Sequence, residues 1–427
     1  MRALTDPVTR LADAEARYAA ENSESHRLHR ERARFMPGGN TRTTIHQSPF
    51  PLTIVRGEGA RLTDADGHVY VDFLGEYTAG LFGHSNEAIA EAIRNALADG
   101  LVLGAPNRYE SLLAEAICTR FPSIDLVRFC NSGTEANLLA LSLCRAVTGR
   151  AGVLVFGGAY HGGILQFAHG MSPLNPPFGW IVGEYNNAAE TARLIEQHAQ
   201  EPAAVIVEPL QGAAGVIPGE TDFLRTLREA TAAREVLLVF DEVMTSRFSR
   251  GGMQQLVGIE PDLTTLAKYV GGGLSFGACG GRANLLRRFD PAQPDPLQHG
   301  GTFNNDVLTM AAGAAGLTKV LTDAEIRRLN DLGDRLRNRL NAFAAERELE
   351  FCATGFGSLV GLHFTSGPIR NEDDIPDFAE LRALLHLHML ERGFSYGRRG
   401  FIALSLPLQE ADVDGFCAAV EEFLVTI

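Results

Sequence analysis

The sequence predicts an α/β fold in which a large, mostly parallel sheet of seven strands is accompanied by a smaller α/β lobe. Seven short apolar segments recur through the middle of the chain, and the stretches between them have apolar residues at helical spacing. This alternation is typical of a parallel sheet with helices on both faces. After a long helical stretch at 323–348, strand and helix patterns alternate again, which predicts the smaller lobe.

The N-terminal part of the chain predicts one helix and one hairpin. Apolar and alanine positions follow helical spacing from Leu11 to Tyr18, so we expect the first forty residues to form a helix that stops before Pro37. Residues 52–73 then alternate around an Asp-Ala-Asp-Gly sequence at 64–67. An Asp-Gly pair between alternating apolar residues is typical of a β-hairpin with a tight turn.

The strands expected in the large sheet share a short apolar run, and they lie at 126–130, 152–156, 180–183, 204–208, 236–241, 263–267 and 276–280. Helical spacing between them is clearest at 135–145 and 221–234. In the smaller lobe the patterns predict strands at 358–364 and 401–406 and helices at 377–392 and 410–425.

Composition excludes several classes of protein. The 427 residues carry a formal net charge of −14 and are 45% hydrophobic, which is typical of a soluble globular protein. The acidity argues against a nucleic acid partner, because phosphate binding needs a concentrated basic face. No apolar run approaches the roughly 20 residues of a membrane span, and the N-terminal residues lack the apolar core of a secretory signal. Six cysteines without a Cys-x-x-Cys pair predict reduced thiols in a cytoplasmic protein.

Lysine is rare in this chain. Only two of the 38 basic residues are lysines, Lys268 and Lys319, and a bias toward arginine codons explains that rarity. Any reaction that needs a lysine amine nevertheless has only these two candidates. Neither is followed by Ser or Thr, so the Gly-Lys-Ser/Thr sequence of a P-loop NTPase is absent.

The two lysines lie in different contexts. Ligands of open α/β sheets bind outside the carboxyl ends of the strands. Lys268 stands at such a strand end and precedes three glycines, and a partly desolvated lysine there loses its proton easily and can form a Schiff base. Lys319 ends a helical stretch, where a surface lysine is the natural interpretation.

An acid stands at a neighbouring strand end. Asp241 follows five apolar residues directly, and its burial would cost several kcal/mol unless it faced a cation such as a protonated heterocycle nitrogen. The alternatives are a helix N-cap or a metal ligand. No His or Asp stands nearby at ligand spacing, so we expect no metal site.

Three further motifs complete the set. Ser132-Gly133-Thr134 separates a strand from a helix and could cradle a phosphate, although a plain N-cap is the alternative. Tyr160 follows the strand at 152–156 and offers an aromatic ring, or merely loop packing. The glycine-rich turn at 299–305 is a second possible anion site. A phosphate cradle, an acid, an aromatic ring and a lysine at strand ends together describe a site for pyridoxal 5′-phosphate (PLP).

The order of these motifs carries a family resemblance over essentially the whole chain. The sequence reads NSGTEAN, AYHG, VEP, VFDEVMTSR, TLAKYVGGG and GGTFNN. It resembles the class III aminotransferases, which are fold-type I PLP enzymes, and within them the branch of glutamate-1-semialdehyde aminomutases and β-amino acid (β-phenylalanine) aminotransferases. The resemblance implies a large PLP-binding domain at 75–320, and a small domain formed by an N-terminal helix and hairpin at 1–74 and a C-terminal part at 321–427.

The resemblance also implies roles for single residues. Lys268 would form the Schiff base and shuttle the proton, and Asp241 would pair with the pyridine nitrogen. Val243 and Tyr160 would pack on opposite faces of the ring, and Glu208 would lie near its substituted edge. The phosphate would be held by Ser132, Gly133, Thr134 and, from the partner subunit of a homodimer, Thr302.

The substrate-facing residues decide the reaction. Aminomutases of this branch usually read PGGVNSPVR near the start and carry an acidic FEAGF-like segment near the end, whereas this chain has PGGNTR, with Arg42, and YGRRGF, with Arg398 and Arg399. Arginines suit a substrate carboxylate, so Arg42 and at least one of the later pair, Arg399 before Arg398, are expected in the site. Further lining residues are expected at Glu76, Tyr77, Leu81 and Phe82, with ordinary core packing as the alternative.

These features resemble the β-amino acid aminotransferases most closely. The expected reaction is a ping-pong transfer of an amino group from a β-amino acid to a 2-oxo acid such as 2-oxoglutarate or pyruvate. The alternatives are an aminomutase that moves the amine within one substrate, and a non-catalytic binder that keeps the fold.

Overall fold

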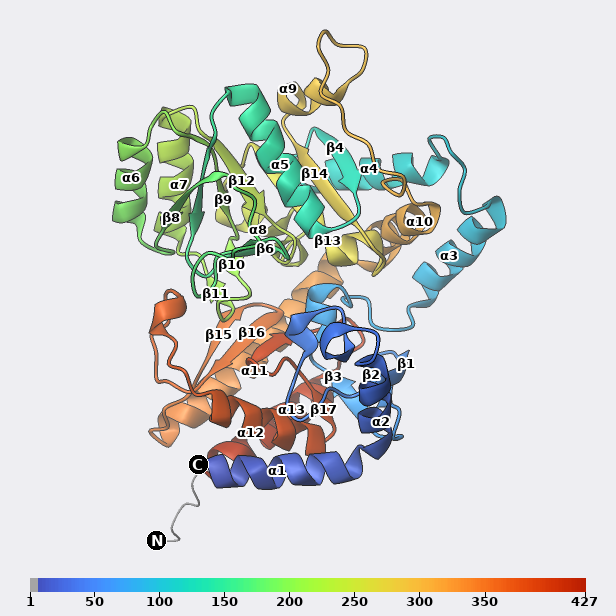
Figure 1. Cartoon of the computed structure of the whole chain (residues 1–427), viewed down its shortest axis with the longest axis vertical. Helices are drawn as coiled ribbons and strands as arrows, with labels where there is room; N and C mark the ends of the chain where they lie inside the picture. The colour runs from blue at the N-terminus through green and yellow to red at the C-terminus, as the bar shows by residue number, and fades with distance from the viewer. Residues whose placement is uncertain (1–6) are drawn as a thin grey trace.

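The structure is a computed structural model that describes residues 7–427. A seven-stranded sheet forms the centre of the upper half of the molecule in Figure 1. Its strands are β4 (Leu126–Cys130), β5 (Gly152–Phe156), β8 (Gly179–Gly183), β9 (Pro202–Val207), β12 (Leu237–Asp241), β13 (Leu263–Ala267) and β14 (Gly277–Gly281). They lie in the order β4-β14-β13-β12-β9-β5-β8, and only β14 pairs antiparallel with its neighbours. The mostly parallel seven-stranded sheet predicted from the sequence is therefore confirmed.

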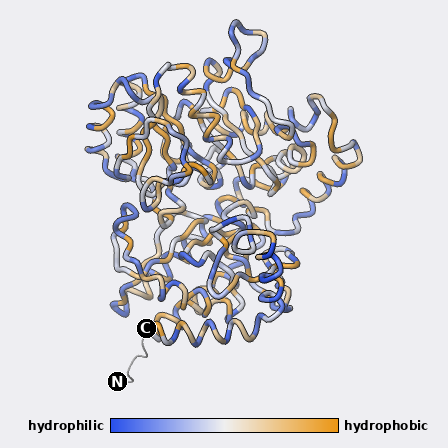
Figure 2. Tube along the Cα trace, viewed as in Figure 1, coloured by the Kyte–Doolittle hydropathy of each residue, from blue (hydrophilic) through white to orange (hydrophobic). Residues whose placement is uncertain are grey.

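Helices cover both faces of this sheet. On one face, α5 (Gly133–Thr148) packs Leu141 and Cys144 against strand residues that include Val155. On the other face, α6 (Ala188–Gln197) and α7 (Thr221–Ala233) pack against the side chains of the same strands that point the other way, such as Phe156. Every residue of β5, β9, β13 and β14 is buried, and Figure 2 shows largely hydrophobic strands inside helices of mixed character. Continuous apolar runs form these strands because neither face meets water.

Smaller elements surround the large sheet. The helix α10 (Val307–Ala315) packs against both α3 (Glu87–Asp99) and α4 (Arg108–Arg120). The remaining elements on this side are α8 (Gly252–Val257), α9 (Ala283–Leu286), and the short paired strands β6 (Tyr160–Gly162) with β7 (Leu165–Gln166) and β10 (Leu210–Gln211) with β11 (Ile217–Pro218).

Two smaller sheets form the lower half of Figure 1. The first contains β1 (Ile54–Glu58), β2 (Arg61–Asp64), β3 (Val69–Asp72) and β17 (Phe394–Ser395), and the second contains β15 (Cys352–Phe356), β16 (Leu359–His363) and β18 (Phe401–Ala403). Because β17 pairs in parallel with β3, segments from both ends of the chain share one sheet. The lobe built from N- and C-terminal segments is thus confirmed, whereas the boundaries at 74/75 and 320/321 stay a prediction, and residues 1–6 lie outside the described part.

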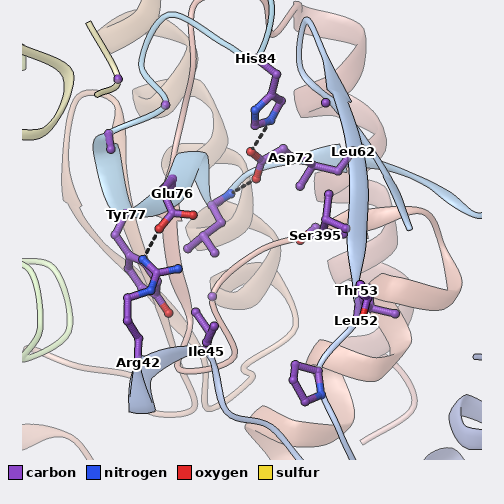
Figure 3. A pocket seen from close by; sticks show the side chains of 18 of the residues that line it. Arg42, Ile45, Leu52, Thr53, Leu62, Asp72, Glu76, Tyr77, His84 and Ser395 are labelled. Atoms are coloured by element: carbon purple, nitrogen blue, oxygen red, sulfur yellow. Dashed lines mark hydrogen bonds and ion pairs between the residues drawn. The ribbon is translucent and has the colours of Figure 1, made fainter. Parts of the chain in front are cut away.

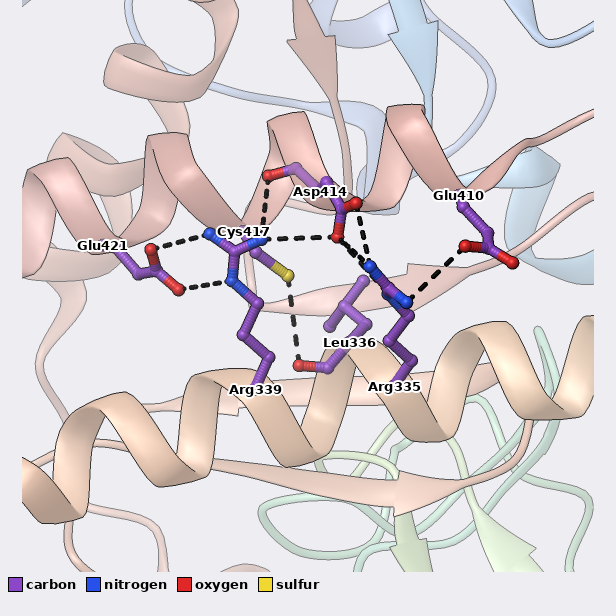
Figure 4. A network of polar contacts seen from close by, with 7 residues as sticks. All are labelled: Arg335, Leu336, Arg339, Glu410, Asp414, Cys417 and Glu421. Atoms are coloured by element: carbon purple, nitrogen blue, oxygen red, sulfur yellow. Dashed lines mark hydrogen bonds and ion pairs between the residues drawn. The ribbon is translucent and has the colours of Figure 1, made fainter.

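Helices of the smaller lobe are α1 (Pro7–Glu21), α2 (Ser23–Arg32), α11 (Asp323–Glu346), α12 (Ala379–Glu391) and α13 (Glu410–Leu424). The helices α11 and α13 pack together and are also joined by charge pairs at their edge (Figure 4). Arg335 donates to Asp414 at 2.8 Å, and Arg339 donates to both oxygens of Glu421 at 2.7 and 2.8 Å. Buried leucines such as Leu336 lie beneath these pairs and provide the larger part of the packing.

The expectation of one N-terminal helix is wrong, because two helices are present and meet at Asn22. The break turns the start of α2 toward the loop between β2 and β3, where Asp66 accepts hydrogen bonds from the backbone N–H groups of Glu24 and Ser25 at 2.7 and 2.9 Å. A carboxylate at a helix N-terminus satisfies two otherwise free donors. The hairpin predicted at 52–73 is present as β2 and β3, and β1 adds a third strand.

Candidate active site

A cavity of about 300 Å³ lies at the carboxyl ends of the large sheet, and we call it the strand-end cavity. It is lined by Asn131, Ser132, Gly133, Thr134, Asn137, Tyr160, His161, Gly162, Glu208, Asp241, Val243, Met244, Ala267, Lys268, Leu274, Ser275 and Phe276. The structure therefore brings together every cofactor-site residue that the sequence predicts, except Thr302.

The N-terminus of α5 opens into this cavity. The Ser132 hydroxyl accepts a hydrogen bond from the Glu135 N–H at 3.1 Å and so caps the helix. The N–H groups of Gly133 and Thr134 have no acceptor within residues 7–427. Gly277 of β14 packs so closely here that a Cβ atom would lie 2.1 Å from the Ser132 carbonyl oxygen. The turn is thus held tightly, and its free N–H groups line the cavity, where they suit an anion.

The Asp241 carboxylate is buried, and three hydrogen-bonding groups fix its position. The Asn137 side-chain amide donates to its Oδ2 at 2.8 Å, and His161 Nδ1 lies at the same distance from that oxygen. The Val243 N–H donates to Oδ1 at 3.0 Å. Strand pairing sets this position, since Asp241 lies opposite Thr265 of β13, three residues before Lys268.

Lys268 directly follows β13 and has a left-handed backbone conformation, with φ of 58°. Burial lowers the pKa of its amine to about 8, although the nearby carboxylates of Asp241 and Glu208 act in the opposite direction. A larger fraction of neutral amine at physiological pH is the property that a nucleophilic lysine needs. Lys319, by contrast, is exposed on a helical turn at Gly316–Val320, as the sequence predicts.

Glu208 follows β9 and faces the same cavity. Its Oε1 accepts a hydrogen bond from the Tyr160 N–H at 2.8 Å, and its Oε2 accepts one from the Gly212 N–H at 3.2 Å. Burial raises the pKa of this carboxyl to about 7, and the neighbouring His161 opposes that shift. Glu208 therefore ties the tyrosine loop to the sheet.

These residues fit PLP in kind and in number. Free N–H groups at a helix N-terminus suit its phosphate, and the buried acid suits its ring nitrogen. Gly133 leaves the necessary room, because a Cβ atom there would lie 3.2 Å from a methyl group of Val243. The single lysine of the cavity can bind the aldehyde carbon.

A second, larger cavity of about 1060 Å³ lies beside the loop at 75–78 and is shown in Figure 3. Arg42 and Glu76 point toward each other and form an ion pair. Tyr77 lies beside them, and its hydroxyl donates to the Thr44 carbonyl oxygen at 3.1 Å. The charges of Arg42 and Arg399 both act on the Tyr160 hydroxyl, lowering its pKa against the larger upward effect of burial. Arg42, Glu76 and Tyr77 line this larger cavity, whereas Arg399 lines neither cavity, although its charge acts on Tyr77 and Tyr160. We call Arg42, Glu76, Tyr77 and Arg399 the mouth.

The other predicted residues are divided between the larger cavity, the core and the surface. Arg398 and Phe82 line the larger cavity, and Arg398 acts on His386, whose pKa falls to about 3 mainly through burial. Leu81 is fully buried in the core, so its expected place among the lining residues is wrong. Thr302 is exposed and lies outside both cavities.

Sequence reasoning missed the residues that hold Asp241. Asn137 bridges its carboxylate to the Thr265 hydroxyl, which donates to Asn137 Oδ1 at 2.6 Å. His161 contacts the same carboxylate from the other side. Both residues stand inside motifs singled out for other reasons, NSGTEAN and AYHG, and their polar character within apolar surroundings was the available signal.

The family model described as Aminotransferase class-III matches residues 43–386 of this chain. The chain belongs to the class III aminotransferase family. Class III aminotransferases are PLP-dependent enzymes, so this chain is a PLP-dependent transaminase of the α/β fold-type I architecture.

Similar proteins extend over nearly the whole chain. A beta-phenylalanine transaminase of Variovorax paradoxus is 50% identical over 415 residues, which are 97% of this chain and 95% of that protein. The crystal structure of a beta-phenylalanine aminotransferase from Variovorax paradoxus matches with a TM-score of 0.97 and 49% identity, over 98% of each chain. A glutamate-1-semialdehyde 2,1-aminomutase of Sorangium cellulosum is 37% identical, over 88% of this chain and 89% of that protein. The transaminase is the nearer of these two kinds of relative.

Within residues 7–427, every helix falls short of the length and apolar character that a membrane span requires.

Proposed function

We propose that this enzyme transfers an amino group from a β-amino acid, such as β-phenylalanine, to a 2-oxo acid such as 2-oxoglutarate or pyruvate. The observation that carries the proposal is the 50% identity to a beta-phenylalanine transaminase over 97% of this chain. A second observation supports it, since arginines from two distant segments, Arg42 and Arg399, both act on Tyr160 of the strand-end cavity.

Residues of the strand-end cavity are proposed to hold PLP, which supplies an electron sink for the reaction when it is bound. The N–H groups of Gly133 and Thr134 and the hydroxyls of Ser132 and Thr134 would hold its phosphate. Asp241 would keep the ring nitrogen protonated. Val243 and Tyr160 would cover the two faces of the ring, and Glu208 would lie at its substituted edge.

Lys268 is proposed to do two things in the reaction. Its amine would bind the cofactor's aldehyde carbon while no substrate is present. Once displaced by the substrate's amine, it would move a proton from the amine-bearing carbon of the substrate to the cofactor carbon. An amine whose pKa burial lowers to about 8 is close to the pH at which a group both accepts and returns a proton efficiently.

The arginines of the mouth are proposed to bind substrate carboxylates. A planar guanidinium matches a carboxylate with two parallel hydrogen bonds. A β-amino acid carries its carboxylate one carbon further from the amine than a 2-oxo acid carries its own from the carbonyl. Two arginines on separate segments can bind the carboxylate at either distance. Tyr77 packs on Phe401 with ring centroids 5.4 Å apart and would limit the width of the substrate side chain.

Two further proposals concern the setting of the enzyme. We infer a homodimer in which Thr302 completes the phosphate site of the partner subunit, because Thr302 lies outside the strand-end cavity of its own chain. Exposed apolar side chains near this segment, Phe303 at 63% and Val102 at 79%, suit such an interface. A cytoplasmic location is supported by six cysteines that form no disulfide within residues 7–427.

Incubation of the purified holoenzyme with β-phenylalanine and 2-oxoglutarate or pyruvate tests the proposal. We expect a keto acid from the donor and glutamate or alanine from the acceptor in equal amounts. The rival activity is isomerisation of glutamate-1-semialdehyde, and the 37% identity to an aminomutase is the observation that favours it. Turnover of the semialdehyde without an acceptor, and none of β-phenylalanine, would favour that rival.

A further inference from the structure

The guanidinium of Arg42 already has a carboxylate partner within the chain. Arg42 Nη1 pairs with Glu76 Oε1, and both side chains are about half exposed, at 48% and 51% (Figure 3). The hydrogen bond that Arg42 donates to Glu76 raises the pKa of Arg42. A residue that is to bind a substrate carboxylate is therefore occupied by a carboxylate of the protein itself.

The placement of Glu76 is imposed by an unusual backbone. Glu76, Tyr77 and Thr78 all have positive φ angles, of 47°, 51° and 82°. A left-handed backbone is unfavourable for residues that carry a Cβ atom, so three in succession require support from the surroundings. Asp72 gives that support, because its Oδ1 accepts hydrogen bonds from the N–H groups of Leu74 and Gly75 at 2.8 and 3.0 Å.

The loop carrying Glu76 is also fixed against the segment carrying Arg42. The Tyr77 hydroxyl donates to the carbonyl oxygen of Thr44, two residues beyond Arg42. Glu76 lines the larger cavity together with Arg42 and not the strand-end cavity, and its charge is among those that act on Lys268. A carboxylate that is to bind Arg42 in the larger cavity must therefore displace Glu76.

We propose that Glu76 is a specificity-determining residue that occupies the Arg42 guanidinium in the free enzyme and yields it to the carboxylate of the substrate. The inference rests on the proposed function, because it takes Arg42 as a carboxylate-binding residue. Exchange of one carboxylate for another leaves the number of ion pairs unchanged, and an exposed pair is weak enough to be exchanged. A ligand without a carboxylate gains nothing from Arg42, so Arg42 selects acids over neutral amines, and Glu76 sets the strength of that preference by competing for the guanidinium.

Binding of two probes to the holoenzyme tests this exchange by calorimetry. The first probe, 3-phenylpropionate, has the carbon skeleton and carboxylate of the donor without its amine, and the second, 3-phenylpropanamide, replaces the carboxylate with a neutral amide. Glu76→Gln removes the competing charge and keeps the shape of the side chain. We expect it to bind 3-phenylpropionate about two- to five-fold more tightly than the unaltered enzyme, and the amide equally.

Two further variants separate the exchange from a general effect of charge. In the background of Arg42→Gln, Glu76→Gln is expected to bring no gain, because the guanidinium for which the carboxylates compete is absent. Glu220→Gln is the matched control, since it breaks an ion pair with Arg370 of similar exposure, 55% and 45%, away from both cavities. It should change neither affinity.

Several outcomes would overturn the inference. Glu76→Gln could leave 3-phenylpropionate binding unchanged or weaken it, which would mean that Glu76 orients Arg42 rather than competing for it. A gain that persists in the Arg42→Gln background, or no binding of 3-phenylpropionate to any variant, would be equally contrary. Turnover of β-phenylalanine by the unaltered enzyme is measured alongside, and its absence would contradict the proposed function whatever the probes show.

Discussion

The strand-end cavity and the mouth hold their polar groups in different ways. In the cavity Asp241 is buried, is the last residue of a sheet strand and is fixed by Asn137, His161 and the Val243 N–H. In the mouth Arg42 and Glu76 are half exposed, stand on loops and hold each other by one ion pair. A buried network fixes one geometry, whereas an exposed pair can be exchanged at little cost. We therefore propose that the chemistry common to the family rests on the rigid part, and the choice of substrate on the adjustable part.

Lys268→Arg should have the largest effect on the rigid part. Arginine keeps the positive charge but stays protonated, so it can neither bind the aldehyde carbon nor relay a proton. We expect kcat to fall by at least about 10²- to 10⁴-fold, with loss of the visible absorbance of the lysine-bound cofactor. Lys319→Arg is the matched control on the only other lysine and should leave both unchanged. Normal turnover by Lys268→Arg would remove this residue from the reaction.

Asp241→Asn should have the second largest effect. The change keeps the size of the side chain and removes the charge that would stabilise a protonated ring nitrogen. We expect kcat to fall about 10²- to 10³-fold in steady-state assays at saturating donor and acceptor. Asp241→Glu keeps the charge and should retain more activity than the asparagine variant. Equal activity of the two variants would show that the fit of the side chain, and not its charge, matters here.

Arg42→Gln and Arg399→Gln should have moderate effects that fall on KM. Each loses a charge-assisted hydrogen bond to a carboxylate, so KM for a carboxylate substrate should rise about ten-fold while kcat changes less. Arg398→Gln is the comparison, because Arg398 lines the larger cavity but its charge acts on His386 and not on Tyr77 or Tyr160. A larger effect of Arg398→Gln than of Arg399→Gln would reverse the assignment of the two neighbours.

The smallest expected effect concerns the pH dependence of stability in the rigid part. Burial raises the pKa of Glu208 from 4.5 to about 7, so the folded protein binds this proton more tightly than the unfolded chain does. The stability that the bound proton contributes is complete below pH 4.5 and is lost as the pH rises through 7. Between pH 6 and 8 the loss should be on the order of 1 kcal/mol.

Urea unfolding of the cofactor-free protein at the two pH values measures this loss. The glutamine of the Glu208→Gln variant does not titrate. The free energy of unfolding of this variant should therefore change less between pH 6 and 8 than that of the unaltered chain. Other groups titrate in both proteins, and the difference between the two slopes isolates Glu208. A slope that is identical in both would contradict the raised pKa.

The sequence predicted the rigid part better than the adjustable part, for physical reasons. Strands such as β5 and β13 were located to the residue, because a fully buried strand leaves a continuous apolar run. Lys268 and Asp241 could be placed because strand ends converge at one edge of a parallel sheet. The Arg42–Glu76 pair and the helix break at Asn22 depend on contacts between segments that are distant in the sequence, such as Asp66 with α2, and no local pattern encodes those contacts.

A half-reaction tests the central claim most directly. Holoenzyme mixed with β-phenylalanine in the absence of any acceptor should release about one keto acid per active site and convert the cofactor to its amine form, seen as loss of visible absorbance. Addition of 2-oxoglutarate or pyruvate should then restore the original spectrum. If β-phenylalanine leaves the spectrum unchanged and no keto acid is released, the account of this chain as a β-amino acid transaminase is contradicted.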